Sequence, residues 1–385
     1  MRKTVSGQIY TEDFCFKTGE VTIENGLIVD VKIFDNCDKT EKYADNNLRG
    51  NHQNAGGVPY VIPGLIDIHM HGAKNIDICQ TDIAGLHNIS KYEYENGITS
   101  FCPTTMTLSV ENLEMICSVI SQAKNESIIG INLEGPFISK DKCGVQNKDF
   151  VLCADADMMG DILQRLADNA GGLIKLVTIA PENPGVLEVI KKYKDQYHFS
   201  VGHTNADYDT CKAAFEAGAD HVTHLYNALS YVNHREPKSL GAVFDSENAF
   251  VEIICDGEHV HPSLVRSAFK IFGDERIVFI SDSTQAAGCE DGEYLLGDVP
   301  IIKNKTRAVS TENSSVLAGS VSNLFDCMKK AVMEMHIPLE KALRAATYNP
   351  AASIGVADTI GSISVGKKAH LVVMDEKMNI LEVFR

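Results

Sequence analysis

Residues 61–72 read "VIPGLIDIHMHG", an apolar run that ends in two histidines separated by one residue. Such a near-continuous apolar run is typical of a strand that a parallel sheet buries on both faces. Because side chains alternate along a strand, His69 and His71 should point to the same side. The stretch therefore predicts a buried strand whose carboxyl end presents two imidazoles.

Seven further apolar stretches of this kind follow, and helical patterns separate most of them. Helices are predicted over 111–124, 207–217 and 262–272, and Gly218 closes the second of these. Buried strands that alternate with helices predict a (β/α)8 barrel with a parallel sheet. The eight candidate strands are residues 64–70, 98–105, 128–135, 174–182, 198–204, 221–228, 250–257 and 277–283.

The two ends of the chain have a different pattern. "GEVTIENGLIVDVKIF" (19–34) places Asn25 and Gly26 between two alternating segments, as in a hairpin with a two-residue turn. The last 25 residues, 361–385, again read as turns and strands. Neither end can bury an apolar face alone, so we expect the two to pair. The predicted division is a small β-sandwich domain from residues 1–61 and 361–385, and a barrel domain over residues 62–360.

The composition narrows the class of partner. The chain has 385 residues, 52 of them acidic and 35 Lys or Arg, which gives a net charge of −17. This excess of negative charge argues against nucleic acid and anionic membranes as partners, although a local Arg or His pocket could still bind an anionic small molecule. The eleven cysteines form no C-x-x-C pair, and neither a leader nor a membrane span is predicted. We therefore expect a cytoplasmic protein.

Ionisable residues stand at the carboxyl ends of most predicted strands. Active sites of (β/α)8 barrels lie at this end, so residues far apart in the sequence should converge there. One histidine or carboxylate at a strand end is commonly a satisfied polar residue or a helix cap. A buried ring of them needs compensating charge, which a divalent cation provides. The ring comprises His69, His71, Glu134, His203, His224, Asp256, His259 and Asp282.

Imidazole and carboxylate ligands without thiolate suit Zn, Fe, Co, Ni or Mn, and zinc is the first choice. Such an ion lowers the pKa of a bound water from about 15.7 toward 7. Asp282 is placed to accept the proton of that water and to return it to a leaving group. The ligand set is large enough for two ions, and we predict that two bind. The predicted metal ligands are His69, His71, Glu134, His203, His224 and Asp282.

A series of motifs then resembles a known family. The order and spacing of "VIPGLIDIHMHG", "INLEGPF", "VGHTNADY", "THLYNAL" with "HREP", "CDGEHVHP", "ISDS", "DGEYLLG", "VLAGS" and "TYNPA" are similar to those of N-acetylglucosamine-6-phosphate deacetylases of the amidohydrolase superfamily. The resemblance covers nearly the whole chain. It implies metal-dependent hydrolysis of N-acetyl-D-glucosamine 6-phosphate to D-glucosamine 6-phosphate and acetate, a step in amino-sugar catabolism and recycling.

The resemblance also implies roles for residues of the ring. Glu134, His203 and His224 would bind the principal ion. Asp282 would be the catalytic acid and base. His259 would contact the substrate and help to polarise the acetamide carbonyl as a second catalytic residue.

Further residues would bind the phosphorylated sugar. The main chain at Asn227 and Ala228 and the guanidinium of Arg235 would hold the phosphate, because a planar Arg fork suits phosphate oxygens. In the family this phosphate site is completed across a homodimer interface, so a homodimer is expected. The residues expected to line the sugar or acetyl pocket are Val145, Gln146, Leu317, Ala318 and Gly319.

Two positions depart from the family pattern. Gln146 stands where the family usually has a histidine, and Gln285 stands where it often has an arginine. Both changes fall at expected substrate contacts rather than at metal ligands. N-acetylgalactosamine 6-phosphate, which differs from the gluco sugar in one hydroxyl, therefore stays an alternative substrate.

Other functions for the same barrel are less well supported. A cyclic-amide hydrolase or deaminase usually needs a metal-bridging lysine late in a barrel strand, whereas Lys175 stands at the beginning of its predicted strand. A non-catalytic scaffold would be expected to have lost ligands, and the ring described above is complete.

Overall fold

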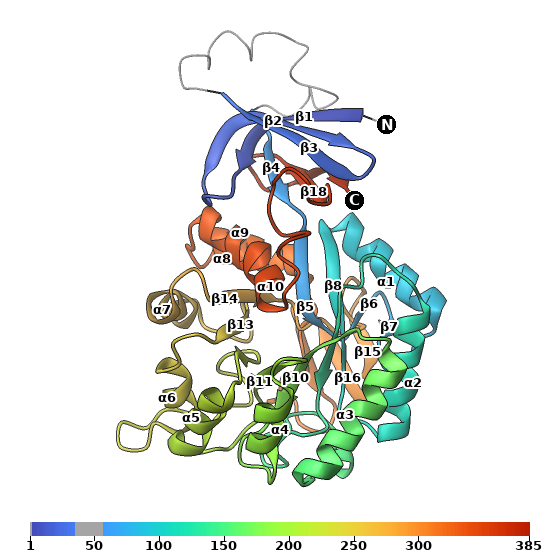
Figure 1. The fold of residues 1–385 in the computed structure, drawn as a ribbon, viewed down its shortest axis with the longest axis vertical. Helices are drawn as coiled ribbons and strands as arrows, with labels where there is room; N and C mark the ends of the chain where they lie inside the picture. The colour runs from blue at the N-terminus through green and yellow to red at the C-terminus, as the bar shows by residue number, and fades with distance from the viewer. Residues whose placement is uncertain (1, 35–56) are drawn as a thin grey trace.

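The computed structural model describes residues 2–34 and 57–385. Residues 1 and 35–56, which belong to the predicted terminal domain, lie outside the described residues. The central element is an eight-stranded parallel sheet in the order β14-β13-β12-β11-β10-β9-β8-β5 (Figure 1). Its strands are β5 (Leu65–Met70), β8 (Ile98–Thr105), β9 (Ile131–Glu134), β10 (Ile174–Ile179), β11 (His198–Val201), β12 (His221–Val222), β13 (Phe250–Ile254) and β14 (Ile277–Ile280).

Backbone hydrogen bonds just beyond β14 bring the two edges of this sheet together. Asp282 N donates to His69 O at 2.9 Å, and His71 N donates to Ser283 O at 2.7 Å. The predicted barrel is thereby confirmed. Within residues 61–72, β5 covers residues 65–70, all of which are buried, as a two-sided parallel strand requires. Residues 61–63 belong instead to β4 (Tyr60–Pro63) of another sheet, and His71 directly follows β5.

Helices separate the barrel strands as predicted. Over two of the predicted segments the structure has α2 (Val110–Gln122) and α7 (Pro262–Phe272). In the third, α5 (Tyr208–Ala217), the Asp207 side chain accepts the Thr210 N–H and Gly218 forms the C-cap. The other helices between barrel strands are α1 (Ile83–Glu95), α3 (Ala156–Ala170), α4 (Val186–Tyr193) and α6 (Lys238–Phe244).

The two ends of the chain share a six-stranded sheet, in the order β19-β18-β4-β1-β2-β3. Asn25 and Gly26 both have positive φ, at 52° and 76°, and join β2 to β3 as the predicted two-residue turn. The segment just before β18 is hydrogen-bonded to β3, where Ile28 N donates to Lys367 O at 2.9 Å. The sheet thereby encloses an apolar cluster of its own. The strands are β1 (Arg2–Tyr10), β2 (Phe16–Glu24), β3 (Leu27–Ile33), β4 (Tyr60–Pro63), β18 (Leu371–Met374) and β19 (Ile380–Phe384). The domain boundaries given above stay a prediction.

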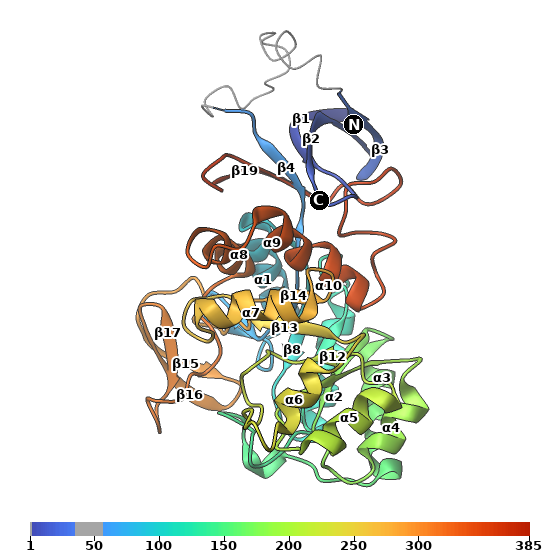
Figure 2. The same cartoon turned by 90° about the vertical axis from the view of Figure 1, so that its left-hand side faces the viewer.

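Three helices lie between this sheet and the barrel strands in both Figure 1 and Figure 2. They are α8 (Leu324–Met333), α9 (Leu339–Ala346) and α10 (Tyr348–Ser353). The chain between β14 and α8 also forms a three-stranded antiparallel sheet that the sequence analysis did not predict. Its strands are β15 (Gly292–Leu296), β16 (Val299–Asn304) and β17 (Arg307–Ser310), and a small hairpin of β6 (Gly72–Ala73) and β7 (Ile76–Asp77) follows β5.

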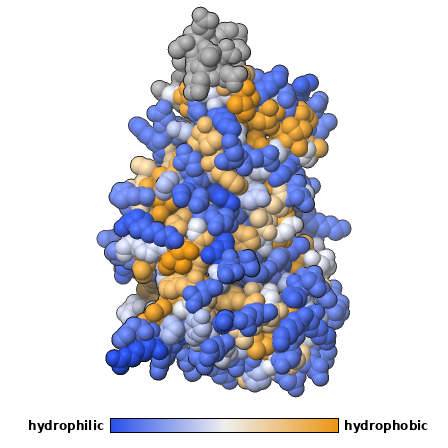
Figure 3. All heavy atoms as spheres, turned by 60° about the vertical axis from the view of Figure 1, so that its left-hand side comes forward, coloured by the Kyte–Doolittle hydropathy of each residue, from blue (hydrophilic) through white to orange (hydrophobic). Residues whose placement is uncertain are grey.

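The face of the molecule shown in Figure 3 is mostly polar, with apolar side chains in separate patches. Among the described residues, no helix is long and apolar enough to span a bilayer.

Candidate active site

Three of the predicted site residues share an unusual backbone position. His203, His224 and Asp282 are each the second residue after the end of a barrel strand. Their φ angles are 45°, 29° and 48°, in a region that residues other than glycine rarely adopt. These strands therefore end before the residues that were predicted to end them. Strain of this kind is concentrated at functional sites, and here it recurs at one end of the barrel.

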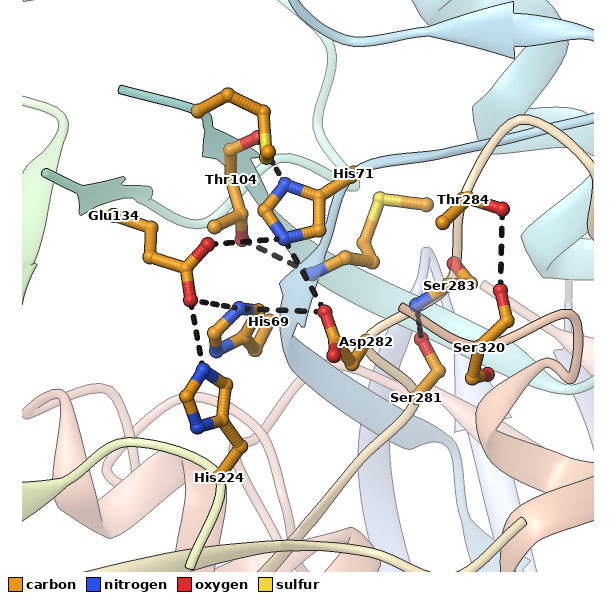
Figure 4. Close-up of polar contacts among 12 residues, drawn as sticks. His69, His71, Thr104, Glu134, His224, Ser281, Asp282, Ser283, Thr284 and Ser320 are labelled. Carbon is orange, nitrogen blue, oxygen red and sulfur yellow. Dashed lines mark hydrogen bonds and ion pairs between the residues drawn. The ribbon is translucent and has the colours of Figure 1, made fainter. Parts of the chain in front are cut away.

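Glu134, the last residue of β9, lies among four imidazoles. Its Oε1 lies 3.0 Å from Nε2 of both His203 and His224 and 3.5 Å from Nε2 of His69. Its Oε2 lies 3.4 Å from Nε2 of His71. Figure 4 shows Glu134 facing His69, His71 and His224. We call these five buried residues the carboxyl-end cluster: His69, His71, Glu134, His203 and His224.

The carboxyl-end cluster contains two groups of possible metal ligands that share Glu134. One is His69, His71 and Glu134, and the other is Glu134, His203 and His224. Asp282 lies on the side of the first group, with its Oδ1 3.2 Å from His71 Nε2 and 3.7 Å from His69 Nε2. The structure thus brings together all six residues that were predicted as metal ligands.

The hydrogen bonds of the imidazole rings test whether this cluster fits a metal ion. His203 Nδ1 lies 2.8 Å from Lys142 O, and His71 Nδ1 lies 3.2 Å from Thr104 O. A carbonyl oxygen only accepts, so in the neutral rings Nδ1 carries the hydrogen and Nε2 carries the lone pair. Those lone pairs face the Glu134 carboxylate, which is also an acceptor. A cation between them removes this conflict, so the donor set fits a metal ion.

Glu252 is a buried carboxylate of this site that the sequence analysis missed. It lies in β13, is 1% exposed, and its Oε2 lies 2.9 Å from His69 Nδ1 and accepts the His224 N–H at 3.2 Å. This bond orients the His69 ring so that its Nε2 faces Glu134. Among the described residues, His69 Nε2 has no hydrogen-bond partner. The available signal was Glu252 itself, the single charged residue in the apolar run "FVEIIC" (250–255), because a buried charge needs a partner.

The electrostatics of the cluster favour positive charge. Burial alone would lower the pKa of His71, but hydrogen bonds to Asp282 and Glu134 outweigh it and raise that pKa to about 9. Burial would raise the pKa of Glu134, but the charges of His203 and His69 hold it well below its usual range. Protons and a divalent cation therefore compete for the same place.

A cavity of about 570 Å³ opens beside the cluster. His259 lines it, and its Nδ1 lies 2.7 Å from Asp256 Oδ2. Asp256 Oδ1 accepts the backbone N–H groups of Glu258 and His259, both at 2.9 Å. Burial would lower the pKa of His259, but Asp256 outweighs it and raises that pKa. Asp256, which was predicted as a member of the ring, thus orients His259.

Most of the residues predicted to bind the sugar line this cavity. They are Val145, Gln146, Asn227, Ala228, His259, Leu317 and Gly319. Gln146 also holds Glu134, because its Nε2 donates to Glu134 Oε2 at 2.8 Å while its Oε1 accepts the Thr107 N–H at 2.7 Å. At Gly319, where φ is 57°, a Cβ atom would lie 2.9 Å from Asp282 O, so a side chain there would press on Asp282.

Three of the predicted residues lie elsewhere. Ala318 is fully buried and does not line the cavity, although its neighbours do. Arg235 lies on the exposed segment 231–236, and it too is not among the lining residues. Gln285 donates to Leu295 O at 2.6 Å and so bonds to β15 instead of the cavity.

Several lining residues were not predicted. Leu296 comes from the inserted sheet, whose pairing has no counterpart in the pattern of a (β/α)8 barrel. Ser315 and Val316 follow the same sheet, and Lys142 lies on the loop after β9. A lysine in a polar loop carries no pattern that distinguishes it from a solvated one, so the sequence alone offered no signal for Lys142.

A second group of histidine and carboxylate lies at the opposite end of the barrel strands. His198 begins β11, and Asp220 and His221 stand at the start of β12; we call these the amino-end trio. His198 Nδ1 lies 2.6 Å from Asp220 Oδ2, and His221 Nδ1 lies 3.0 Å from Asp220 Oδ1. Burial would raise the pKa of Asp220, but the two histidines outweigh it and hold that pKa below its usual range.

Comparisons with known proteins agree with this geometry. A model described as "Amidohydrolase family" matches residues 60–385. The chain is 32% identical to an N-acetylglucosamine-6-phosphate deacetylase of Bacillus subtilis, over 97% of this chain and 93% of that protein. It is 29% identical to an N-acetylgalactosamine-6-phosphate deacetylase of Escherichia coli O157:H7, over 84% and 85%. A solved structure of a mutant N-acetyl-D-glucosamine-6-phosphate deacetylase from Mycobacterium smegmatis, in complex with N-acetyl-D-glucosamine-6-phosphate, superposes with a TM-score of 0.89 and 28% identity, over 100% of this chain and 98% of that one.

Proposed function

Because the chain belongs to the amidohydrolase family, we propose that it hydrolyses the acetamide of N-acetyl-D-glucosamine 6-phosphate, giving D-glucosamine 6-phosphate and acetate. The observation that carries the proposal is the convergence of two ligand groups on Glu134, next to Asp282 and beside a cavity that His259 lines. The cavity falls in the range of roughly 300–1,000 Å³ that is usual for small-molecule sites.

Glu134, His203 and His224 would hold the principal ion, and His69, His71 and Asp282 a second one, with Glu134 shared. Zinc is proposed first, and Fe, Co, Ni or Mn would suit the same ligands. A bound ion supplies a Lewis acid that acidifies water and polarises the amide carbonyl. The second ion has its own test, because a metal content of one ion per chain in metal-replete protein would count against it.

Asp282 is proposed as the catalytic acid and base. Burial would raise its pKa, but the hydrogen bond with His71 and the neighbouring histidine charges outweigh it and lower that pKa, which favours the carboxylate form. As a carboxylate it accepts a proton from the attacking water. It then passes that proton to the amine nitrogen as the C–N bond breaks, which releases acetate and the free amine.

His259 is proposed to stabilise the oxygen of the acetamide as negative charge develops there. Asp256 accepts the Nδ1 hydrogen and raises the pKa of His259, which favours the imidazolium form. In that form Nε2 also carries a hydrogen and can donate to the acetamide oxygen.

The phosphate group is proposed to bind near Asn227 and Ala228, which line the cavity. Arg235 is proposed to complete the phosphate site of a second subunit in a homodimer. Its exposure on the segment 231–236 supports that role, because an exposed guanidinium is free to reach a neighbour. A cytoplasmic location remains part of the proposal.

Acetate release from both 6-phosphorylated N-acetylhexosamines tests the function and its variant. We expect turnover of the gluco sugar and use the ratio of kcat/KM values to decide between it and the galacto sugar, since relatives of both kinds match the chain. Dihydropyrimidines and purines form the comparison panel. Hydrolysis of that panel without acetate release from either sugar would replace this proposal by a cyclic-amide hydrolase or deaminase.

A further inference from the structure

Lys142 holds a position that none of the roles given so far uses. It lines the cavity from the loop after β9, and its Nζ donates to Leu229 O at 3.3 Å. The same ammonium lies 5.6 Å from the centre of the Tyr231 ring. It therefore reaches from its own loop to the segment that continues from Asn227 and Ala228, where the phosphate is proposed to bind.

The charges around the cavity make this ammonium important. Among the described residues that line the cavity, Lys142 is the one lysine or arginine, whereas Glu134, Asp141 and Asp282 are acidic. The chain as a whole has a net charge of −17. A doubly charged phosphate entering this cavity needs a local cation to offset that field. A lysine ammonium is a common partner of phosphate and acts as a point charge.

The backbone of Lys142 is fixed relative to the carboxyl-end cluster. Lys142 O lies 2.8 Å from His203 Nδ1, and Ser139 N, in the same turn, donates to His203 O at 2.9 Å. Lys142 N donates to Ser139 O at 3.1 Å and closes the turn. The side chain of Lys142 therefore extends toward the phosphate end from a base anchored to a proposed metal ligand. Replacing the side chain leaves this main-chain anchor in place.

We propose that Lys142 is the subunit's own phosphate-binding cation and that it makes the site prefer 6-phosphorylated amino sugars over unphosphorylated ones. This inference rests on the proposed function. It differs from the role of Arg235, which would act from a second subunit. Because Lys142 contacts the phosphate and not the acetamide, it contributes to the affinity for the ligand and not to the chemical step. The product keeps the 6-phosphate, so Lys142 should bind product and substrate alike.

The test is the Kd of D-glucosamine 6-phosphate, measured by calorimetry on the metal-replete protein. Lys142→Met should raise this Kd about 10- to 100-fold, the usual effect of losing a hydrogen bond to a charged group. Lys142→Arg keeps the charge and should restore most of the affinity. Lys140→Met removes an exposed lysine two residues away that does not line the cavity, so it should leave the Kd unchanged.

An unchanged Kd in Lys142→Met, or equal weakening in Lys142→Met and Lys142→Arg, would overturn the inference. Acetate release by the unmodified protein is recorded separately. A protein that releases no acetate but loses affinity for the sugar phosphate in Lys142→Met would contradict the proposed function while supporting the role of Lys142. In active protein, Lys142→Met should raise KM for the phosphorylated substrate by more than it changes kcat/KM for N-acetyl-D-glucosamine itself.

Discussion

The two ends of the barrel contain the same residue types in different arrangements. In the amino-end trio, the Nδ1 atoms of His198 and His221 each face a separate oxygen of Asp220. In the carboxyl-end cluster, four imidazoles face one carboxylate, and at least two of them present lone pairs to it. The first group pairs each Nδ1 with its own carboxylate oxygen, although His221 Nε2 has no hydrogen-bond partner among the described residues. The second needs positive charge, either as protons on its imidazoles or as a metal ion, and it opens onto a cavity.

The comparison shows that residue type and spacing do not by themselves define a metal site. The two groups differ in whether hydrogen bonds from outside the group fix the orientation of the rings, as they do for three of the four cluster histidines. Lys142 O, Thr104 O and Glu252 occupy the Nδ1 atoms of three cluster histidines and turn their Nε2 atoms toward Glu134. In the trio the Nδ1 atoms themselves point at the carboxylate.

The largest expected effect is at Asp282, the proposed catalytic group next to the carboxyl-end cluster. Asp282→Asn removes the proton acceptor while keeping the size of the side chain. We expect kcat to fall by about 10²- to 10⁴-fold, the usual contribution of general acid–base catalysis. Steady-state acetate release is the measurement, with product binding as the control for an intact site. Activity within about tenfold of the unmodified protein would contradict the role of Asp282.

The next effect is at His259. His259→Gln should lower kcat by about 10²- to 10³-fold, as expected for loss of a donor to a developing oxyanion. The metal content of the variant should equal that of the unmodified protein, because His259 is not a proposed ligand. A loss of bound metal would instead make His259 part of the cluster.

Asp256→Asn tests the proposed role of His259 through the pH dependence of kcat. Asp256 raises the pKa of His259, so the imidazolium form persists to higher pH and is lost as the pH rises through that value. Removing the charge of Asp256 lowers this pKa, and the alkaline limb of kcat should move to lower pH. Asp282 and Glu258 also raise the pKa of His259 and remain in the variant, so the shift should be partial. A pH profile that keeps its alkaline limb would exclude His259 as the titrating group.

A smaller effect is expected at Glu252, which orients His69 within the cluster. Glu252→Gln keeps an acceptor for His69 Nδ1 but removes the charge. Carboxylates that support a metal-bound histidine commonly contribute about 10- to 100-fold in metal affinity or activity, and the lower end applies here because the hydrogen bond survives. Competition for the metal by a chelator of known affinity measures the effect. Unchanged affinity would show that His69 does not bind an ion.

The smallest effect is expected in the amino-end trio. His198→Ala should leave acetate release and metal content unchanged, because the trio lies at the other end of the barrel from the cavity. Loss of one partly exposed ion pair should lower the free energy of unfolding by about 1 kcal/mol or less, which denaturant titration can measure. Loss of one bound ion per chain would make the trio a metal site and remove the contrast between the two ends.

Much of this architecture could be predicted from the sequence, because apolar strands and helix caps are local patterns. The run that ends in His69 and His71 indicated both a barrel strand and the side its ligands face. The inserted sheet of β15–β17 could not be foreseen, since its pairing follows no barrel repeat. Glu252 had a signal in its apolar strand that was not used. The positions of Arg235 and Lys142 depend on loop conformation, which is set by long-range contacts such as that of Lys142 O with His203.

Acetate release from N-acetyl-D-glucosamine 6-phosphate, before and after removal of bound metal by a chelator, tests the central claim most directly. The claim is that the carboxyl-end cluster holds the ions that make hydrolysis possible. We predict that the chelated protein loses its activity and that added Zn²⁺, or another of the proposed divalent ions, restores it. Full activity in protein shown to be free of metal would contradict the account.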